Sequence, residues 1–211
     1  MHSNNFFNNF YIFNIIIYNI KSKLIYIYKI MNFINKGMYN LLCKFRNTET
    51  LTVVNSIAKI DDYNLIIPNL YLGNIKCAHN LNFLLEHNIY GIVNCTEHEP
   101  FHEYFNDQNK KKIRLNINDS RSDENIEKFK SEIIQTINFI DSCLEENKPV
   151  FVHCYWGLMR SATVVACYLI KKYNLKADDA IFIVKTNRPF SLLSFYNFNE
   201  ILQFVEDTYK K

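Results

Sequence analysis

From about residue 60 onward, the apolar residues of this chain follow two alternating patterns. Apolar runs of strand length occupy residues 65–72, 89–95, 113–117 and 150–154, with strict alternation in the third, and such runs between polar segments favour strands. Elsewhere the apolar residues recur at steps of three and four, which is typical of a helix that buries one face. Strands that alternate with helices predict the α/β class, in which helices pack on a sheet.

The clearest helical pattern begins at Ser122. Its apolar residues share one face of the predicted helix and are Ile126, Phe129, Ile133, Ile137, Ile140 and Leu144. Further helices are predicted over residues 161–173, 178–186 and 196–208. The chain has 211 residues and no internal repeat, so we expect one full-sized core.

Residues 1–58 differ in composition from the rest of the chain. They are dominated by Asn, Ile, Tyr, Phe and Lys, and up to Thr48 they include six Lys or Arg and no acidic residue. We therefore predict two parts, a low-complexity basic extension at residues 1–58 and a folded domain at residues 59–211.

Two interpretations of the extension stay open. Its biased composition favours a disordered or loosely helical segment. Alternatively, aromatic and basic side chains bring residues 1–45 into peripheral contact with a membrane. The apolar stretch at residues 10–20 is short for a span, which needs about 20 residues, and it lacks the basic start and small-residue cleavage site of a signal peptide.

Charge and cysteine content narrow the function of the folded part. The net charge is +3, but 18 basic and 21 acidic residues follow Thr48, and a faintly acidic body argues against a nucleic-acid partner. The cysteines form neither a C-x-x-C pair nor a zinc-binding spacing, so we expect no metal site and no disulfide framework. A reducing compartment, the cytoplasm or the nucleus, is the expected location. The six cysteines are Cys43, Cys77, Cys95, Cys143, Cys154 and Cys167.

The stretch HCYWGLMRSA, residues 153–162, directly follows the apolar run of the fourth predicted strand. A strand, a short loop and a helix aim backbone N–H groups at an anion, because the first helical turn leaves its donors unpaired and carries the positive end of the dipole. Gly157 supplies the backbone freedom that a tight anion-binding turn requires. The predicted phosphate-binding residues are Tyr155, Trp156, Gly157, Leu158, Met159 and Arg160.

Four side chains of this stretch are candidates for a catalytic role. The donors that hold a phosphate also stabilise a thiolate, the attacking form of Cys154. Arg160 can hold two phosphoryl oxygens, the Ser161 hydroxyl can hydrogen-bond the sulfur, and His153 supports the loop. Taken singly, such a cysteine is more often a core residue and such an arginine is more often solvated. Their combination at this spacing favours a catalytic site.

The stretch resembles the signature loop of the cysteine-dependent protein phosphatases, which is a cysteine, five residues, an arginine and then serine or threonine. We call residues 154–160 the signature loop. The chain is most similar to the dual-specificity branch, because IIPNLYLGN (66–74) resembles the opening strand and turn of that branch, GIVNCT (91–96) its second core strand, and SATVVACYLIKKYNL and DDAIFIVKTNRP the two helices after the loop.

The resemblance covers roughly residues 60–209. It implies a phosphatase-type fold with a central mixed sheet flanked by helices, and no cofactor. It also implies hydrolysis of phosphotyrosine and of phosphoserine or phosphothreonine on proteins through a cysteinyl phosphate.

Hydrolysis in two steps needs an acid for the departing oxygen and then a base for water, and one carboxyl group can serve as both. Asp119 stands two residues beyond the third predicted strand, and Asn118 with Asp119 resembles the dipeptide that carries the general acid in the family. Asp119 is our choice, although a turn aspartate without a catalytic role also fits. Asp123 is the alternative, but with Ser122 it is more typical of a helix N-terminus.

The sequence departs from the family pattern at two places that border the expected pocket. Met159 stands where a small hydroxyl residue often precedes the arginine, and FSLLSF (190–195) replaces the usual Pro-Asn after Arg-Pro. Neither change removes a chemical role, but both make the substrate harder to infer.

The signature loop contains no lysine, whereas superfamily members that act on polyphosphorylated lipids tend to carry lysines there. A phosphorylated side chain on a protein is therefore the expected substrate. Tyr155 and Trp156 either stack against it or pack inward. Lys110, Lys111 and Lys112 are expected to form a solvated loop, with a docking patch for acidic substrates as the alternative.

Cys95 ends a predicted strand that, by the resemblance, runs beside the signature loop. Some relatives use a cysteine there to trap the oxidised nucleophile as a reversible disulfide, and a buried inert thiol is the other interpretation.

Three function classes remain for the chain as a whole. They are an active protein phosphatase, a catalytically weak phospho-binding module of the same fold, and a phosphatase for RNA 5′ ends or lipids.

Overall fold

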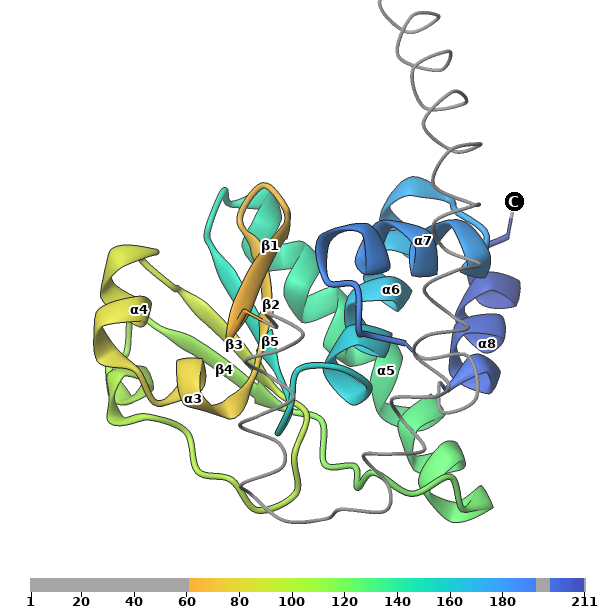
Figure 1. Ribbon diagram of the computed structural model, residues 1–211, viewed down its shortest axis with the longest axis horizontal. Helices are drawn as coiled ribbons and strands as arrows, with labels where there is room; N and C mark the ends of the chain where they lie inside the picture. The colour runs from red at the N-terminus through yellow and green to blue at the C-terminus, as the bar shows by residue number, and fades with distance from the viewer. Residues whose placement is uncertain (1–60, 193–197, 211) are drawn as a thin grey trace, which may run out of the picture. The chain divides into compact units, whose positions relative to one another are not determined.

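A computed structural model describes residues 61–192 and 198–210. Its centre is a five-stranded sheet with the order β1-β2-β5-β3-β4 (Figure 1). The strands are β1 (Tyr63–Ile67), β2 (Leu70–Gly73), β3 (Gly91–Asn94), β4 (Lys111–Arg114) and β5 (Val150–His153). β1 is antiparallel to β2, and the other neighbouring pairs are parallel. The mixed sheet confirms the predicted fold class and puts β5 in the middle.

Helices cover both faces of the sheet. On one face lie α5 (Asp123–Glu145), α6 (Arg160–Tyr173), α7 (Ala177–Asn187) and α8 (Asn199–Tyr209). On the other lie α3 (Ile75–Ala78), α4 (Leu81–Glu86) and the 3₁₀ helix η1 (Glu103–Asn106). Neighbouring residues of β5 point to opposite faces, so Val150 and Val152 pack with α5 and α6 while Phe151 packs against α4.

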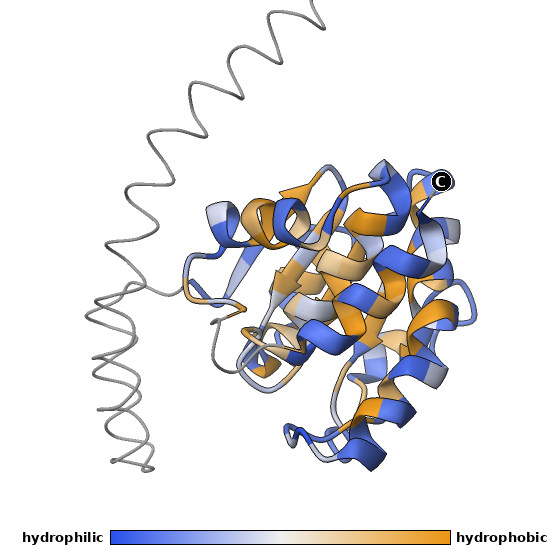
Figure 2. Cartoon of the chain, turned by 90° about the vertical axis from the view of Figure 1, so that its right-hand side faces the viewer, coloured by the Kyte–Doolittle hydropathy of each residue, from blue (hydrophilic) through white to orange (hydrophobic). Residues whose placement is uncertain are grey.

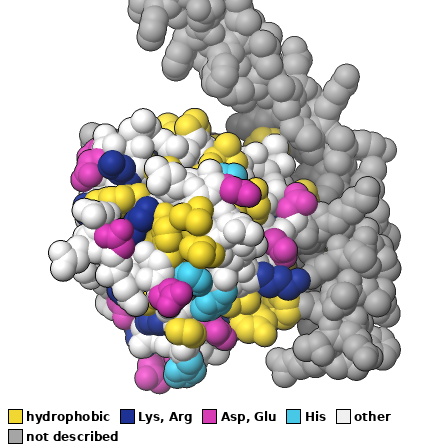
Figure 3. All heavy atoms as spheres, turned by 90° about the vertical axis from the view of Figure 1, so that its left-hand side faces the viewer, with side chains coloured by type: hydrophobic (Ala, Val, Ile, Leu, Met, Phe, Trp, Pro, Cys, Tyr) yellow, Lys and Arg dark blue, Asp and Glu magenta, His cyan; other side chains and the backbone are white. Residues whose placement is uncertain are grey.

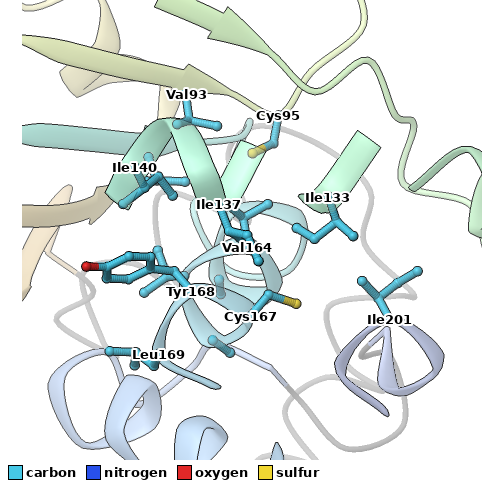
Figure 4. Packing of buried hydrophobic residues seen from close by; sticks show 14 of the residues in the cluster. Val93, Cys95, Ile133, Ile137, Ile140, Val164, Cys167, Tyr168, Leu169 and Ile201 are labelled. Atoms are coloured by element: carbon cyan, nitrogen blue, oxygen red, sulfur yellow. The ribbon is translucent and has the colours of Figure 1, made fainter. Parts of the chain in front are cut away.

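The apolar periodicity explains the helices on the larger face. Ser122 caps α5 by accepting a hydrogen bond from Asn125 N, and Asp123 stands in the first turn. The predicted apolar positions of α5 are buried except for the half-buried Leu144. Helix α6 is buried from Arg160 through Ile170 and forms the centre of the core (Figure 4). Figure 2 shows the apolar segments of these helices facing one another and the polar ones facing outward.

The predicted strand at residues 65–72 is in fact a hairpin. The chain reverses at Pro68 and Asn69, and Ile67 pairs with Leu70 across the turn. Asn69 has φ 65, a left-handed conformation that asparagine tolerates better than most residues. Residues on both sides of the turn face the core and are apolar. The hydropathy pattern therefore looks like one strand and does not show the reversal.

The predicted strand at residues 113–117 is displaced, since β4 spans Lys111–Arg114. The expectation of a solvated loop at Lys110–Lys112 is therefore wrong for two of the three residues, which lie in the edge strand. Their side chains bind nearby groups, because Lys110 Nζ donates to Ile89 O, Lys111 pairs with Glu146, and Lys112 Nζ donates to Asn106 Oδ1. Figure 3 shows the face of the molecule on the side of α3 and α4. Basic and acidic side chains are mixed there and do not form separate patches.

Several other predictions can be compared with the described residues. The helices predicted at residues 161–173 and 178–186 are α6 and α7, with ends shifted by one residue. The last helix begins at Asn199, and residues 196 and 197 lie outside the described part. The extension at residues 1–58, including the membrane contact expected of residues 1–45, also lies outside it. No helix among the described residues is long and apolar enough to cross a membrane.

Candidate active site

The signature loop joins the carboxyl end of β5 to the first residue of α6. β5 is flanked by β2 and β3, both parallel to it, so the loop emerges at the end of the sheet where parallel strands present their carboxyl termini. Ligands of open α/β sheets bind at this edge. The 14-residue helix α6 adds the positive end of its dipole.

Every carbonyl group of residues 155–159 is held by a donor outside the loop or further along α6. The five distances lie between 2.7 and 3.3 Å, and the donors in chain order are Ile75 N, Arg188 Nη2, Arg188 Nε, Leu192 N and Thr163 N. In a trans peptide the N–H points opposite to the preceding carbonyl. Outward carbonyls therefore turn the loop's N–H groups inward, as an anion site requires.

Gly157 is the one position in the loop that only glycine can occupy. Its φ is +69, and a Cβ atom there would collide with the carbonyl oxygen of Gly73. The left-handed backbone and the close approach to β2 together exclude any side chain. The glycine expected from the sequence thus meets a second constraint, the neighbouring strand, that the sequence did not reveal.

The Cys154 sulfur lies at the floor of the loop and is 2% exposed. It accepts hydrogen bonds from Gly157 N and from Ser161 Oγ, both at 3.2 Å. Two donors from different parts of the chain therefore converge on this sulfur. Ser161 is itself fully buried, so its hydroxyl is held in place.

His153 supports the loop from within the sheet. Its ring is fully buried, stacks on Phe151, and has Nδ1 3.4 Å from the carbonyl oxygen of Cys154. Burial lowers the pKa of His153 to about 3, which favours the neutral imidazole near pH 7.

The structure brings Asp119 next to Arg160. Oδ1 of Asp119 lies 3.3 Å from Nε of Arg160, an ion pair without hydrogen-bond geometry. Nη1 of Arg160 donates to Ile117 O on the same segment. The Asp119 side chain is 45% exposed, so water reaches it. Asp123 instead lies in the first turn of α5, where its charge favours the helix dipole.

Asn125, which the sequence analysis did not single out, holds the segment that carries Asp119. Its side chain is buried, accepts a hydrogen bond from Asn118 N and donates to Asn118 O and Ser120 O at 3.1, 3.1 and 2.7 Å. These contacts bracket Asp119 on both sides. Nothing in the sequence marked this amide, because the neighbouring apolar positions dominate the helix pattern.

We expect Asn125→Ala to weaken protonation of the leaving group more than nucleophilic attack. Loss of the three hydrogen bonds frees the Asp119 segment, and misplacing a catalytic group can cost 10²-fold, so roughly a tenfold fall in kcat for an alkyl phosphate is expected. Substrates with a good aryl leaving group should fall less. Asn138→Ala is the matched control on α5, since Asn138 is exposed and its Oδ1 accepts a hydrogen bond from Lys171 on α6. Equal losses for both substrates would contradict the prediction.

The remaining predicted residues lie around the loop. Tyr155 and Trp156 are 42% and 39% exposed and contact each other edge to face, so they do not pack inward. Met159 packs against the main core. Cys95 is fully buried directly after β3, the strand next to β5, and its N–H donates to His153 O. Among the described residues, no group of three or more potential ligands could hold a metal ion.

Arg188 is the second residue that sequence reasoning missed, although it belongs to the quoted segment DDAIFIVKTNRP. Its guanidinium is almost completely buried and donates to two carbonyls of the signature loop. An arginine near a helix end is usually solvated, so residue type alone gave no signal of its burial.

Comparisons with known proteins agree with this geometry. The family model "Dual specificity phosphatase, catalytic domain" matches residues 70–207. The chain is 36% identical over 140 residues to dual specificity protein phosphatase 9 of Homo sapiens, covering 66% of this chain and 35% of that protein. It is 33% identical over 127 residues to dual specificity protein phosphatase 1 of Arabidopsis thaliana, covering 60% of each. The chain thus spans about a third of the length of the first of these relatives.

A solved structure shows the same likeness in three dimensions. The human tyrosine phosphatase-like serine/threonine/tyrosine-interacting protein superposes with a TM-score of 0.60 at 26% identity. The match covers 70% of this chain and 97% of that structure.

Proposed function

Because the chain belongs to the dual-specificity phosphatase family, we propose that it hydrolyses phosphotyrosine and phosphoserine or phosphothreonine on proteins through a cysteinyl phosphate. The supporting observation is the setting of the Cys154 sulfur. It accepts two hydrogen bonds at the floor of a loop in which the carbonyls of residues 155–159 are held by other donors.

In the first step the Cys154 thiolate attacks phosphorus and the bond to the substrate oxygen breaks. Asp119 gives its proton to that oxygen, which leaves as a neutral hydroxyl. Arg160 and the loop N–H groups hold the other phosphoryl oxygens and stabilise the charge that develops on them. For this, Arg160 exchanges its ion pair with Asp119 for the phosphate.

In the second step water attacks the cysteinyl phosphate. Asp119, now ionised, takes a proton from that water, the S–P bond breaks, and inorganic phosphate leaves. The Ser161 hydroxyl, 3.2 Å from the sulfur, stabilises the departing thiolate. No step needs a cofactor, so a chelator should leave the rate unchanged.

The rim of the loop supports a protein substrate. Tyr155 and Trp156 present exposed aromatic surface beside the phosphate cradle, which suits an aromatic or apolar side chain. The loop offers no lysine for additional phosphates.

The test is phosphate release by the purified full chain from phosphopeptides, phosphoinositides and triphosphate-ended RNA. Turnover of phosphotyrosine and phosphothreonine peptides above the other two classes is the expected result. Preference for lipid or RNA would overturn the substrate class. Phosphopeptide binding without turnover would favour the non-catalytic module and reject the enzyme.

We further propose that Cys95 protects the nucleophile during oxidation. Peroxide converts the Cys154 thiolate to a sulfenic acid, then the Cys95 thiol attacks that sulfur, the S–S bond forms and water leaves. Burial, together with the neighbouring Cys154 charge, raises the pKa of Cys95 well above its usual value, so Cys95 reacts as the thiol and its proton leaves with the water.

Mass spectrometry after mild peroxide should therefore show a disulfide between Cys95 and Cys154, with activity restored by dithiothreitol. In Cys95→Ala the same treatment should oxidise Cys154 further, to the sulfinic acid, and the activity loss should be permanent. A stable sulfinic acid on Cys154 of the unmodified protein would reject the proposal.

A further inference from the structure

Arg188 follows α7 directly and places a guanidinium group inside the protein, 1% exposed. Four hydrogen bonds use its N–H groups. Nε donates to Gly157 O at 2.7 Å and Nη2 to Trp156 O at 3.3 Å, while Nη1 donates to Asp61 O at 2.9 Å and to Asn64 Oδ1 at 2.6 Å. The side chain thus bridges the middle of the signature loop and the start of the β1 hairpin.

The middle of the loop depends on this side chain. The carbonyls of Tyr155, Leu158 and Met159 are held by backbone N–H groups, which no side-chain substitution removes. Trp156 O and Gly157 O receive theirs from the Arg188 guanidinium. The planar guanidinium holds its N–H donors in a fixed arrangement that suits two adjacent carbonyls, and the ammonium group of a lysine cannot reproduce it.

The two carbonyls set the direction of two amide hydrogens. In a trans peptide, fixing Trp156 C=O fixes the opposite direction for Gly157 N–H, and that N–H donates to the Cys154 sulfur at 3.2 Å. Fixing Gly157 C=O does the same for Leu158 N–H. Both N–H groups belong to the set that is turned toward the phosphate.

The charge of Arg188 acts in the same direction. Its four hydrogen bonds all go to neutral oxygens, and the Asp61 and Asp62 carboxylates act on the cation only through space. A guanidinium stays protonated in proteins. Arg188 therefore adds a positive charge at the middle of the signature loop.

We propose that Arg188 is a positioning residue that ties Trp156 and Gly157 to Asp61 and Asn64, so that the loop N–H groups stay aimed at the sulfur and the phosphate. The proposal rests on the proposed function. It also extends the functional unit, because Asp61 and Asn64 precede the range 70–207 that matches the family model.

The test compares Arg188→Met and Arg188→Lys with Arg114→Met in the full chain. Arg114 is the matched control, since it is half-buried and donates to the carbonyls of Thr96 and Glu99, outside the signature loop. Three measurements are made on each variant, the affinity for vanadate, the rate of alkylation of Cys154 by iodoacetate, and the melting temperature.

Arg188→Met should weaken vanadate binding by roughly 10²-fold, the loss expected when donors to an anion are misaligned, and should slow alkylation. Arg188→Lys should recover part of both, because it restores the charge without the planar arrangement of donors. Asn64→Ala should have a smaller effect and should add nothing in the Arg188→Met background, since both act through one network.

A melting-temperature loss like that of Arg114→Met, with normal vanadate affinity and alkylation, would overturn the proposal and leave Arg188 a purely structural residue. Vanadate binding and alkylation do not require turnover. If the unmodified protein binds vanadate but hydrolyses no phosphopeptide, the proposed function fails while the role of Arg188 is still decided.

Discussion

Cys154→Ser is expected to abolish phosphate release, with a fall on the order of 10⁴-fold or more, because the step that forms the covalent intermediate loses its nucleophile. A serine hydroxyl in the same place keeps nearly the same shape but is a much weaker nucleophile than a cysteine sulfur. The measurement is the initial rate with an aryl phosphate and with a phosphotyrosine peptide. The Cys154→Ser variant should no longer form a covalent adduct with vanadate, but it should still bind phosphopeptides non-covalently.

Cys143→Ala provides the control for this experiment. Cys143 is also buried, but it lies on α5 with its sulfur facing Gly91, and it has no place in the catalytic steps. Its replacement should leave the rate within about a factor of two, as expected for a residue away from the reacting atoms. Cys154→Ser protein that keeps more than a tenth of the wild-type rate would exclude the cysteinyl phosphate.

Asp119→Asn is expected to lower kcat by roughly 10²- to 10⁴-fold for phosphoserine peptides, whose alkoxide leaves poorly without a proton. The loss should be smaller for an aryl phosphate with a stable leaving group. Asparagine keeps the size of the side chain and removes only the transferable proton. Rates are to be measured across substrates of graded leaving-group acidity, and the dependence on acidity should steepen in the variant.

Asp123→Asn is the matched control, because Asp123 was the alternative acid and lies in the first turn of α5. Its loss should cost at most about 1 kcal/mol of stability through the helix dipole and leave the leaving-group dependence unchanged. The assignment would be reversed if Asp123→Asn, rather than Asp119→Asn, steepened that dependence.

The periodic pattern predicted the core helices well because burial itself produces that pattern. Ile126, Phe129, Ile133, Ile137 and Ile140 recur on one face of α5 and are buried there. Strand ends were harder to predict, since a strand ends where its partner does. β4 pairs with β3, whose last pair joins Asn94 and Arg114, so residues 115–117 lie beyond the ladder although they continue the apolar pattern.

The hairpin of β1 and β2 shows a second limit of the pattern. Ile66, Leu70 and Leu72 all join the main core, which makes the run look continuous through the turn. Pro68 and Asn69 were the local signals for a reversal, and they were outweighed by the apolar residues around them.

The sequence by itself determined the class of the fold and the position of the signature loop. It also singled out Cys154, Gly157 and Arg160 as candidate site residues, because they lie within one strand, loop and helix whose geometry is local. Only the tertiary structure brought Asp119 to Arg160, set Asn125 around the Asp119 segment, and buried Arg188 behind the loop. Each of these contacts forms only when segments that are separate in the sequence fold together. The type of a polar residue does not say whether its side chain will bind water or another part of the protein.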